Sequence, residues 1–250
     1  MRAAARTAIL GSVTTVFVHG ALETGEVWDA LRDCLDTDSI AVSLPGIAGP
    51  PATGFGASKD AYADWLHATL TRIDGPIDLV GHAWGALLAL RIATAFALPL
   101  RSWSVDAAYG FHPDYTWPRS VRAALHDGSI DAWLRDGRER LTRLGVAPSL
   151  ARSMAAAHTD QTSASLLALL RSATPNVHAD WGAAATGPAP TPGLVILAAA
   201  DPYGDEALSV EMAQRLGART VRFDDLGHSW MLEDPQLVAT ALQDFWSSLR

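Results

Sequence analysis

The segment Gly81-His82-Ala83-Trp84-Gly85 has the spacing of a turn that presents one side chain for chemistry. The short, mostly apolar segment 77–80 before it predicts a strand, and residues 84–96 after it predict a helix. Small residues at both ends of such a turn let the backbone pass through a strained conformation, so that the central side chain projects beyond the strand. The backbone N–H of Trp84 would then lie at a helix N-terminus, where it can stabilise an anion.

The central residue of this turn is Ala83. A methyl group cannot attack a substrate, accept a proton or donate a hydrogen bond, so covalent catalysis through residue 83 is excluded. Two residues after other expected strands can still do acid–base chemistry. His228, in Gly227-His228-Ser229, is expected to be a general base, and Asp201 is expected to be its acid partner. Asp106 also follows an expected strand, at 101–105.

The turn His19-Gly20-Ala21 follows the first expected strand. Its position predicts that the backbone N–H of Ala21, together with that of Trp84, forms an oxyanion hole. His19 and His82 are expected to be structural. No group of residues has the spacing of a metal site, a phosphate-binding loop or a nucleotide-binding motif, so neither a metal nor a cofactor is expected.

The elements that must position these residues alternate between strands and helices at both ends of the chain. Such alternation predicts a mostly parallel sheet with helices on its faces. Strands are expected at 13–18, 40–44, 77–80, 101–105, 194–198 and 220–223. Helices are expected at 27–35, from Ser58 onward, at 84–96, at 208–216 before Gly217, and after Asp234-Pro235.

Between residues 111 and 185 the strand signal stops, and helical patterns such as 129–144 and 162–170 replace it. We therefore predict a core formed by 1–110 and 186–250 and a helical cap formed by 111–185. Trp133, within this cap, is a candidate substrate-binding residue. Trp103, Trp133 and Trp181 are expected mainly to pack within the cap.

Composition excludes several classes of partner. The chain has 250 residues, of which 49% are hydrophobic, and its 27 acidic and 19 basic residues give a net charge of −8. A phosphate backbone would be repelled, and no basic cluster offsets this, so a nucleic-acid partner is not expected. No apolar run approaches the roughly 20 residues of a membrane span. The sequence does not indicate an oligomeric state.

Two features bear on the cellular compartment. Cys34 is the single cysteine, so no intrachain disulfide can form. The first 20 residues superficially resemble a signal peptide, but their apolar run ends in 17–20, which are needed as a core strand and loop. Cleavage would destroy the fold, so a cytoplasmic protein is expected.

Over essentially its whole length the chain resembles the α/β-hydrolase superfamily. The order Ala83, Asp201, His228 matches nucleophile, acid and base in that fold. The resemblance also makes Asp106 an alternative acid, since some members place the acid after the preceding strand. GHAWG resembles the GHDWG of epoxide hydrolases and haloalkane dehalogenases, where Asp is the nucleophile, whereas serine esterases and lactonases usually have GHSxG. The epoxide-hydrolase pattern is incomplete, since that group has an HGxP turn where this chain has His19-Gly20-Ala21-Leu22. The cap of epoxide hydrolases also supplies two tyrosines that activate the epoxide. Tyr109 and Tyr115 are the only tyrosines near the expected cap, so the resemblance makes them candidate substrate-binding residues.

The resemblance and Ala83 together leave three functions open, each with a small, mostly apolar molecule as partner. In the first alternative, the chain is an inactivated variant of an enzyme that hydrolyses an ester, lactone or epoxide. Alternatively, it is a naturally nucleophile-free acid–base enzyme of lyase, cyclase or dioxygenase type that uses His228 and Asp201. The third alternative is a non-catalytic ligand-binding relative, which the intact His and Asp disfavour.

Overall fold

The structure is a computed structural model that describes residues 13–51, 53–126 and 137–249. Its six described strands form one sheet in the order β2-β1-β3-β4-β5-β6, and every neighbouring pair is parallel. The strands are β1 (Thr14–Val18), β2 (Ser39–Val42), β3 (Ile77–Gly81), β4 (Leu100–Val105), β5 (Gly193–Ala198) and β6 (Arg219–Phe223). The predicted parallel sheet is confirmed, and the strand ends differ from those expected by one or two residues.

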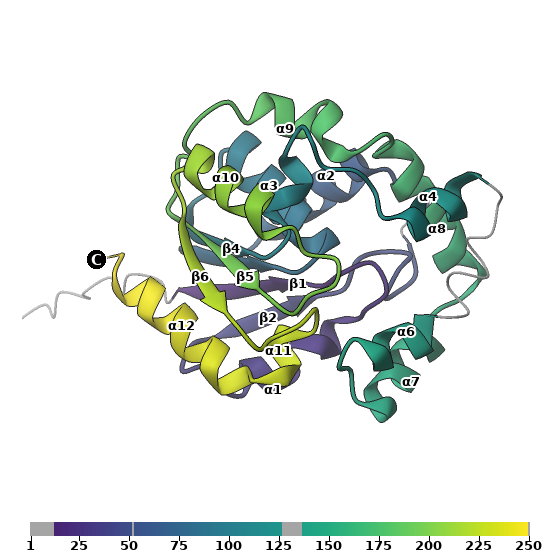
Figure 1. Cartoon of the computed structure of the whole chain (residues 1–250), viewed down its shortest axis with the longest axis horizontal. Coiled ribbons are helices and arrows are strands. Elements are labelled where there is room, and N and C mark those ends of the chain that lie inside the picture. The colour runs from purple at the N-terminus through teal and green to yellow at the C-terminus, as the bar shows by residue number, and fades with distance from the viewer. Residues whose placement is uncertain (1–12, 52, 127–136, 250) are drawn as a thin grey trace, which may run out of the picture.

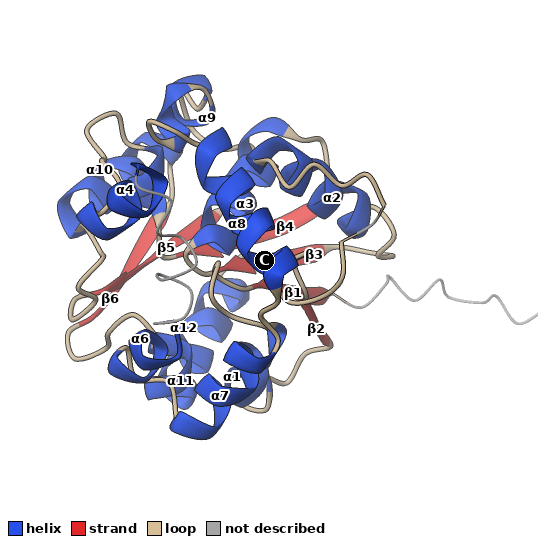
Figure 2. Cartoon of the chain, turned by 90° about the vertical axis from the view of Figure 1, so that its right-hand side faces the viewer, coloured by secondary structure: helices blue, strands red, loops and turns tan. Residues whose placement is uncertain are grey.

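Helices cover both faces of this sheet (Figure 1). One face carries α2 (Lys59–Leu70), α3 (Trp84–Ala95) and α10 (Glu206–Leu216). The other face carries α1 (Asp29–Arg32), α11 (Trp230–Glu233) and α12 (Pro235–Ser247), with the short 3-10 helix η1 (Gly25–Trp28) leading into α1. Figure 2 shows the strands between these two helical layers. The continuous helix expected at 27–35 is therefore wrong in its extent, because the segment is a 3-10 turn followed by one α-helical turn.

The core divides into two apolar clusters because successive strand side chains point to opposite faces of a sheet. Val18, Leu79 and Val195 are buried in the cluster under α2, α3 and α10. Phe17 and Val80, their neighbours in β1 and β3, are buried in the cluster under α1 and α12. Strands that are covered on both faces need apolar residues at successive positions, which explains the short apolar runs in the sequence.

Several helix ends follow the local signals in the sequence. The Ser58 side chain accepts a hydrogen bond from Ala61 N at 3.1 Å at the start of α2, and Asp234 accepts one from Leu237 N at 2.9 Å at the start of α12. Gly217 ends α10 with φ +68°, a left-handed conformation that favours glycine. Across the described ranges, no helix combines the length and the apolar character that a membrane crossing requires.

The described parts of the segment between β4 and β5 consist of helices joined by loops. It contains η2 (Ala108–Phe111), α4 (Arg119–His126), α6 (Gly137–Arg143), α7 (Pro148–Ala156), α8 (Asp160–Ser172), η3 (Val177–Ala179) and α9 (Trp181–Ala184). No strand occurs in the described parts of 111–185, as expected for a helical insertion. The division into core and cap at residues 111 and 185 stays a prediction. Trp133 lies outside the described residues.

Trp103 does not pack within the cap, so that expectation is wrong. It belongs to β4, it is fully buried, and its indole Nε1 donates a hydrogen bond to Thr191 O at 3.0 Å. Its ring lies so close to Gly193 in β5 that a Cβ on residue 193 would approach it to 2.0 Å. Trp103 is therefore an inward-facing core residue of the sheet. Trp181, in α9, is buried as expected.

Candidate active site

The turn at Ala83 joins β3 directly to α3. Ala83 has φ +50° and ψ −115°, a conformation that residues with a side chain rarely adopt. The flanking glycines permit this tight turn, because a Cβ on Gly81 would lie 2.4 Å from Gly85 O and a Cβ on Gly85 would lie 2.0 Å from Val18 O. The turn thus keeps the geometry that displays a central side chain, although that side chain is a methyl group.

His228 and Asp201 form the hydrogen bond that the sequence predicts. The His228 Nδ1 lies 2.9 Å from Asp201 Oδ2, and the two side chains are 15% and 10% exposed. The other oxygen of Asp201 accepts a hydrogen bond from Tyr203 N at 2.8 Å, which fixes the carboxylate. With Nδ1 bonded to a carboxylate, Nε2 of His228 is the ring nitrogen left for a substrate.

Asp106, the alternative acid, has different partners. Its carboxylate accepts hydrogen bonds from Ala83 N at 2.9 Å and from Trp230 Nε1 at 2.8 Å, and it contacts His82 Nδ1. These three contacts tie the turn at residue 83 to the end of β4 and to α11. Asp201 is therefore the acid paired with His228 in this structure, and Asp106 supports the turn.

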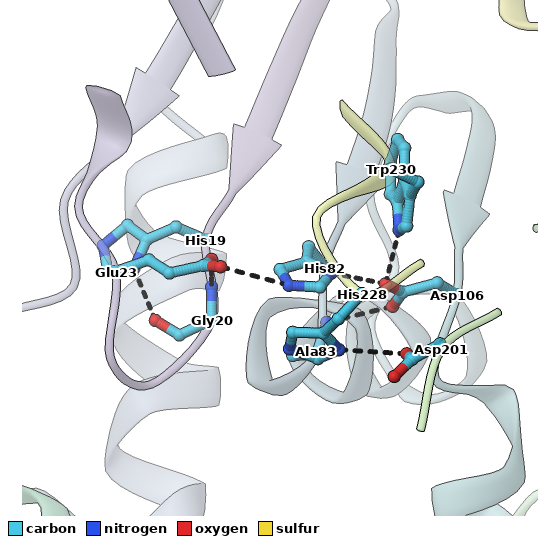
Figure 3. A network of polar contacts seen from close by, with 9 residues as sticks. All are labelled: His19, Gly20, Glu23, His82, Ala83, Asp106, Asp201, His228 and Trp230. Carbon is cyan, nitrogen blue, oxygen red and sulfur yellow. Dashed lines mark hydrogen bonds and ion pairs between the residues drawn. The ribbon is translucent and has the colours of Figure 1, made fainter. Parts of the chain in front are cut away.

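The His82 side chain is fully buried. It lies between the carboxylates of Glu23 and Asp106 (Figure 3). Its Nδ1 faces Asp106, and its Nε2 lies 3.2 Å from Glu23 Oε1, an ion-pair distance without hydrogen-bond geometry. Burial alone would lower the pKa of His82, but Glu23 and Asp106 outweigh burial and raise this pKa well above 6.5. Burial alone would raise the pKa of Glu23, but His82 outweighs it and lowers this pKa to about 2. The three groups form a buried row of carboxylate, imidazolium and carboxylate.

A cavity of about 140 Å³ opens in front of Ala83. His228, Glu23 and the two candidate oxyanion residues, Ala21 and Trp84, all line it. Among the described residues, neither the Ala21 N–H nor the Trp84 N–H donates a hydrogen bond to another protein group. The remaining lining residues are mostly apolar or aromatic and include Leu22, Tyr115, Trp117, Pro118, Val121, Leu141, Leu144, Leu166, Leu170 and Tyr203.

The two candidate tyrosines lie differently. Tyr115 lines the cavity at Ala83, and burial raises its pKa, so its phenol is neutral at ordinary pH. Tyr109 lies against Tyr115, with 5.1 Å between ring centroids, and lines a separate, smaller cavity beside Asp106 and Asp201. The structure therefore brings Tyr115, but not Tyr109, to the cavity of His228. Substrate binding by either residue stays a prediction.

A model of the alpha/beta hydrolase family matches residues 15–241. The chain belongs to the alpha/beta hydrolase family. No curated protein sequence matches it. Among solved structures, this family member is similar to a hydrolase from Oleispira antarctica (TM-score 0.75, 18% identity, covering 95% of this chain and 92% of that one). It is also similar to a haloalkane dehalogenase loop variant from Bradyrhizobium elkanii (TM-score 0.72, 17% identity, covering 95% of this chain and 90% of that one). A third similar structure is the bottromycin epimerase in complex with bottromycin A2 (TM-score 0.68, 21% identity, covering 96% of this chain and 92% of that one). At these identities the structures show a shared fold.

Sequence analysis missed three residues of this alpha/beta hydrolase site. Glu23 lies three residues after Gly20 and accepts a hydrogen bond from Gly20 N at 2.8 Å. The ring of Tyr203 lies edge-on to His228, with 5.3 Å between centroids, and Trp230 binds Asp106. Their closeness in sequence to Gly20, Asp201 and His228 was the only available signal, because loop conformation decides where each side chain points.

One group of side chains at the site has the composition of a metal-binding set. Glu23, His82 and His228 each offer a ligand atom, and these atoms lie within 4.8 Å of one another. The three residues come from three distant segments of the chain, so no sequence spacing reveals them.

Proposed function

We propose that this alpha/beta hydrolase family member is an enzyme that acts on a small, mostly apolar molecule without a covalent intermediate. His228 is the general base, and Asp201 orients it. The observation that carries the proposal is the 2.9 Å contact between His228 Nδ1 and Asp201, at a cavity where the nucleophile position holds a methyl group. A carboxylate on Nδ1 fixes the ring and stabilises the imidazolium that forms when Nε2 takes a proton.

The cavity supports a reaction in which an oxygen atom gains negative charge. The N–H groups of Ala21 and Trp84 line it without another protein partner among the described residues. Donors placed in this way stabilise an enolate or a tetrahedral oxyanion. His228 would form an enolate by removing a proton from carbon beside a carbonyl, or a tetrahedral adduct by removing a proton from an attacking water. The bottromycin epimerase among the structural neighbours is named for a reaction other than hydrolysis, which supports such chemistry on this fold.

The strained turn favours a second candidate, a hydrolase whose nucleophile has been lost. Ala83 keeps φ +50° although its methyl group gains nothing from being displayed. This conformation is suited to a reactive side chain. In that case a serine at residue 83 would restore hydrolysis of esters or lactones, and an aspartate would restore the opening of epoxides.

One set of variants tests both candidates. The parent, Ala83→Ser, Ala83→Asp and His228→Ala are assayed on small esters, lactones and epoxides, and on deuterium exchange at carbon acids beside a carbonyl. The first proposal predicts turnover or exchange by the parent, with a loss of about 10²–10⁴-fold in His228→Ala. His112→Ala, whose imidazole lies outside this cavity, is the control and should keep the parent rate.

The outcomes separate the alternatives. A rate gain in Ala83→Ser or Ala83→Asp, approaching the roughly 10⁶-fold cost of removing a nucleophile, would support the lost-nucleophile hydrolase instead. Full turnover by the parent without loss in His228→Ala would refute both candidates. If the parent and all three variants are inactive but still bind small apolar molecules, the remaining alternative is a non-catalytic ligand-binding protein.

A further inference from the structure

We propose that Glu23, His82 and His228 form a binding site for one divalent transition-metal ion at the floor of the cavity. Their ligand atoms all lie within 4.8 Å of one another. The Glu23 Oε1 and His82 Nε2 atoms are 3.2 Å apart, which matches the spacing of about 3.0–3.4 Å between neighbouring ligands of an ion bound at about 2.1 Å. Because the limit of 4.8 Å exceeds this spacing, an ion bound by all three residues would draw the His228 ring closer to the other two ligands.

One buried nitrogen in this group is incompletely satisfied. His82 Nε2 contacts Glu23 Oε1 at 3.2 Å, but this ion pair lacks hydrogen-bond geometry among the described residues. A buried polar atom without a hydrogen bond is uncommon. A metal ion between His82 and Glu23 would displace the Nε2 proton of the imidazolium to solvent and bind both groups directly.

The outer contacts of both histidines match those of metal ligands. The Nδ1 atom of His82 contacts Asp106, and the Nδ1 atom of His228 contacts Asp201, so each ring has Nε2 left for an ion. A metal-binding histidine commonly donates its other N–H to a carboxylate, which fixes the ring and makes the ligand nitrogen more basic. Two such pairs converge on Glu23 here.

The charge and type of the ligands define the class of cation. Glu23, Asp106 and Asp201 place three carboxylates around two imidazoles, which favours a divalent ion. Two imidazoles with one carboxylate suit Zn²⁺, Fe²⁺ or Co²⁺, whereas Mg²⁺ and Ca²⁺ prefer oxygen ligands. Three protein ligands leave at least one coordination position open. Glu23 and His228 line the cavity together with Ala83, whose methyl group is not a competing ligand, so an ion held there would be reached from the cavity.

A bound ion would affect the role of His228 as a base, and only this effect rests on the proposed function. Nε2 of His228 cannot bind a metal and accept a proton at once, so an ion at this site would stop the action of His228 as a base. The site itself is argued only from the positions of its ligands.

The test uses the full chain after treatment with a chelator. Co²⁺ is titrated and followed by visible absorption, Zn²⁺ by calorimetry, and bound metal is measured by elemental analysis. We expect one ion per chain, with affinity at least 100-fold weaker in His228→Ala and Glu23→Gln. Asp201→Asn, which removes the negative charge of an outer contact, should weaken binding by about 10–100-fold. His112→Ala is the matched control, because His112 also contacts two carboxylates, Asp114 and Glu211, and it should keep the parent affinity.

Thermal unfolding of each metal-free variant accompanies the titration. If Glu23→Gln does not fold, His228→Ala carries the test, because His228 lies at the cavity wall and is partly exposed. Absence of a stoichiometric ion, or unchanged affinity in a folded His228→Ala, would overturn the site. A parent that turns over without binding metal contradicts this site alone, and a parent that binds metal without turnover or exchange contradicts the proposed function alone.

Discussion

At the scale of single residues, His82 holds the turn at Ala83 by keeping two buried carboxylates paired. Its side chain is completely buried, and those of Glu23 and Asp106 are 3% and 8% exposed. A buried carboxylate without a partner costs several kcal/mol. His82 therefore stabilises the loop after β1 and the end of β4 at the same time.

His82→Ala should lower the free energy of unfolding by about 3–5 kcal/mol, because it leaves the buried carboxylates of Glu23 and Asp106 without a positive charge between them. The measurement is urea unfolding at neutral pH. His112→Ala is the control, since His112 is also largely buried but its carboxylate partners Asp114 and Glu211 are 82% and 63% exposed. Its loss should be about 1 kcal/mol, because those carboxylates remain hydrated. Equal losses in the two variants would show that the buried carboxylates are not the cause.

The residues that sequence analysis could identify are those fixed by strand ends. Asp201 and His228 follow β5 and β6, so their meeting could be expected from a parallel sheet alone. Glu23 and Tyr203 could not be placed, because the path of a loop decides whether each side chain turns toward the cavity. The convergence of Glu23, His82 and His228 was hidden for the same reason.

At the scale of elements, the contact between β1 and the start of α3 fixes the turn. Gly85, in the first turn of α3, lies so close to β1 that a Cβ would be 2.0 Å from Val18 O. Such an approach of helix to strand is possible only for a residue without a side chain. It allows α3 to lie directly over β3 and β4.

Gly85→Ala should therefore lower the free energy of unfolding by about 3 kcal/mol or more, since the methyl group must push α3 away from β1. Chemical denaturation provides the measurement. Gly187→Ala is the matched control, because no atom lies within 4 Å of a Cβ at residue 187. It should be neutral, or stabilising by up to about 1 kcal/mol through a less flexible unfolded chain. A Gly85→Ala protein as stable as the parent would contradict this account of the turn.

Element types could be predicted where periodicity and caps agree, as at Ser58 and Gly217. Trp103 was misassigned because an aromatic residue near an expected insertion has no local signal for its side of the sheet. In β4, the side chains of Trp103 and Val105 lie on the same face of the sheet, and both are buried in the same apolar cluster. Direction within a strand depends on register, which only the assembled sheet fixes.

At the scale of the whole molecule, the cavity exists because helices of the segment between β4 and β5 meet the turn at Ala83. Trp117, Leu141 and Leu166 come from this segment, and Ala21, Ala83 and His228 come from loops after strands. The sequence could predict a helical insertion from the loss of strand signal. It could not predict which helical side chains line the cavity, because that depends on how the helices dock.

This arrangement predicts that bulk added to α8 blocks the cavity. Leu166→Trp should weaken binding of a neutral fluorescent probe, phenylnaphthylamine, by at least tenfold, because Leu166 is fully buried and lines the cavity with Ala83. Overpacking should also cost about 1–3 kcal/mol of stability, so unfolding is measured in parallel. Leu125→Trp is the control, since Leu125 lines a separate hollow with Arg122 and Arg171, and it should bind the probe as the parent does. Equal binding by a folded Leu166→Trp would place the probe elsewhere and remove the cavity at Ala83 as the apolar binding site.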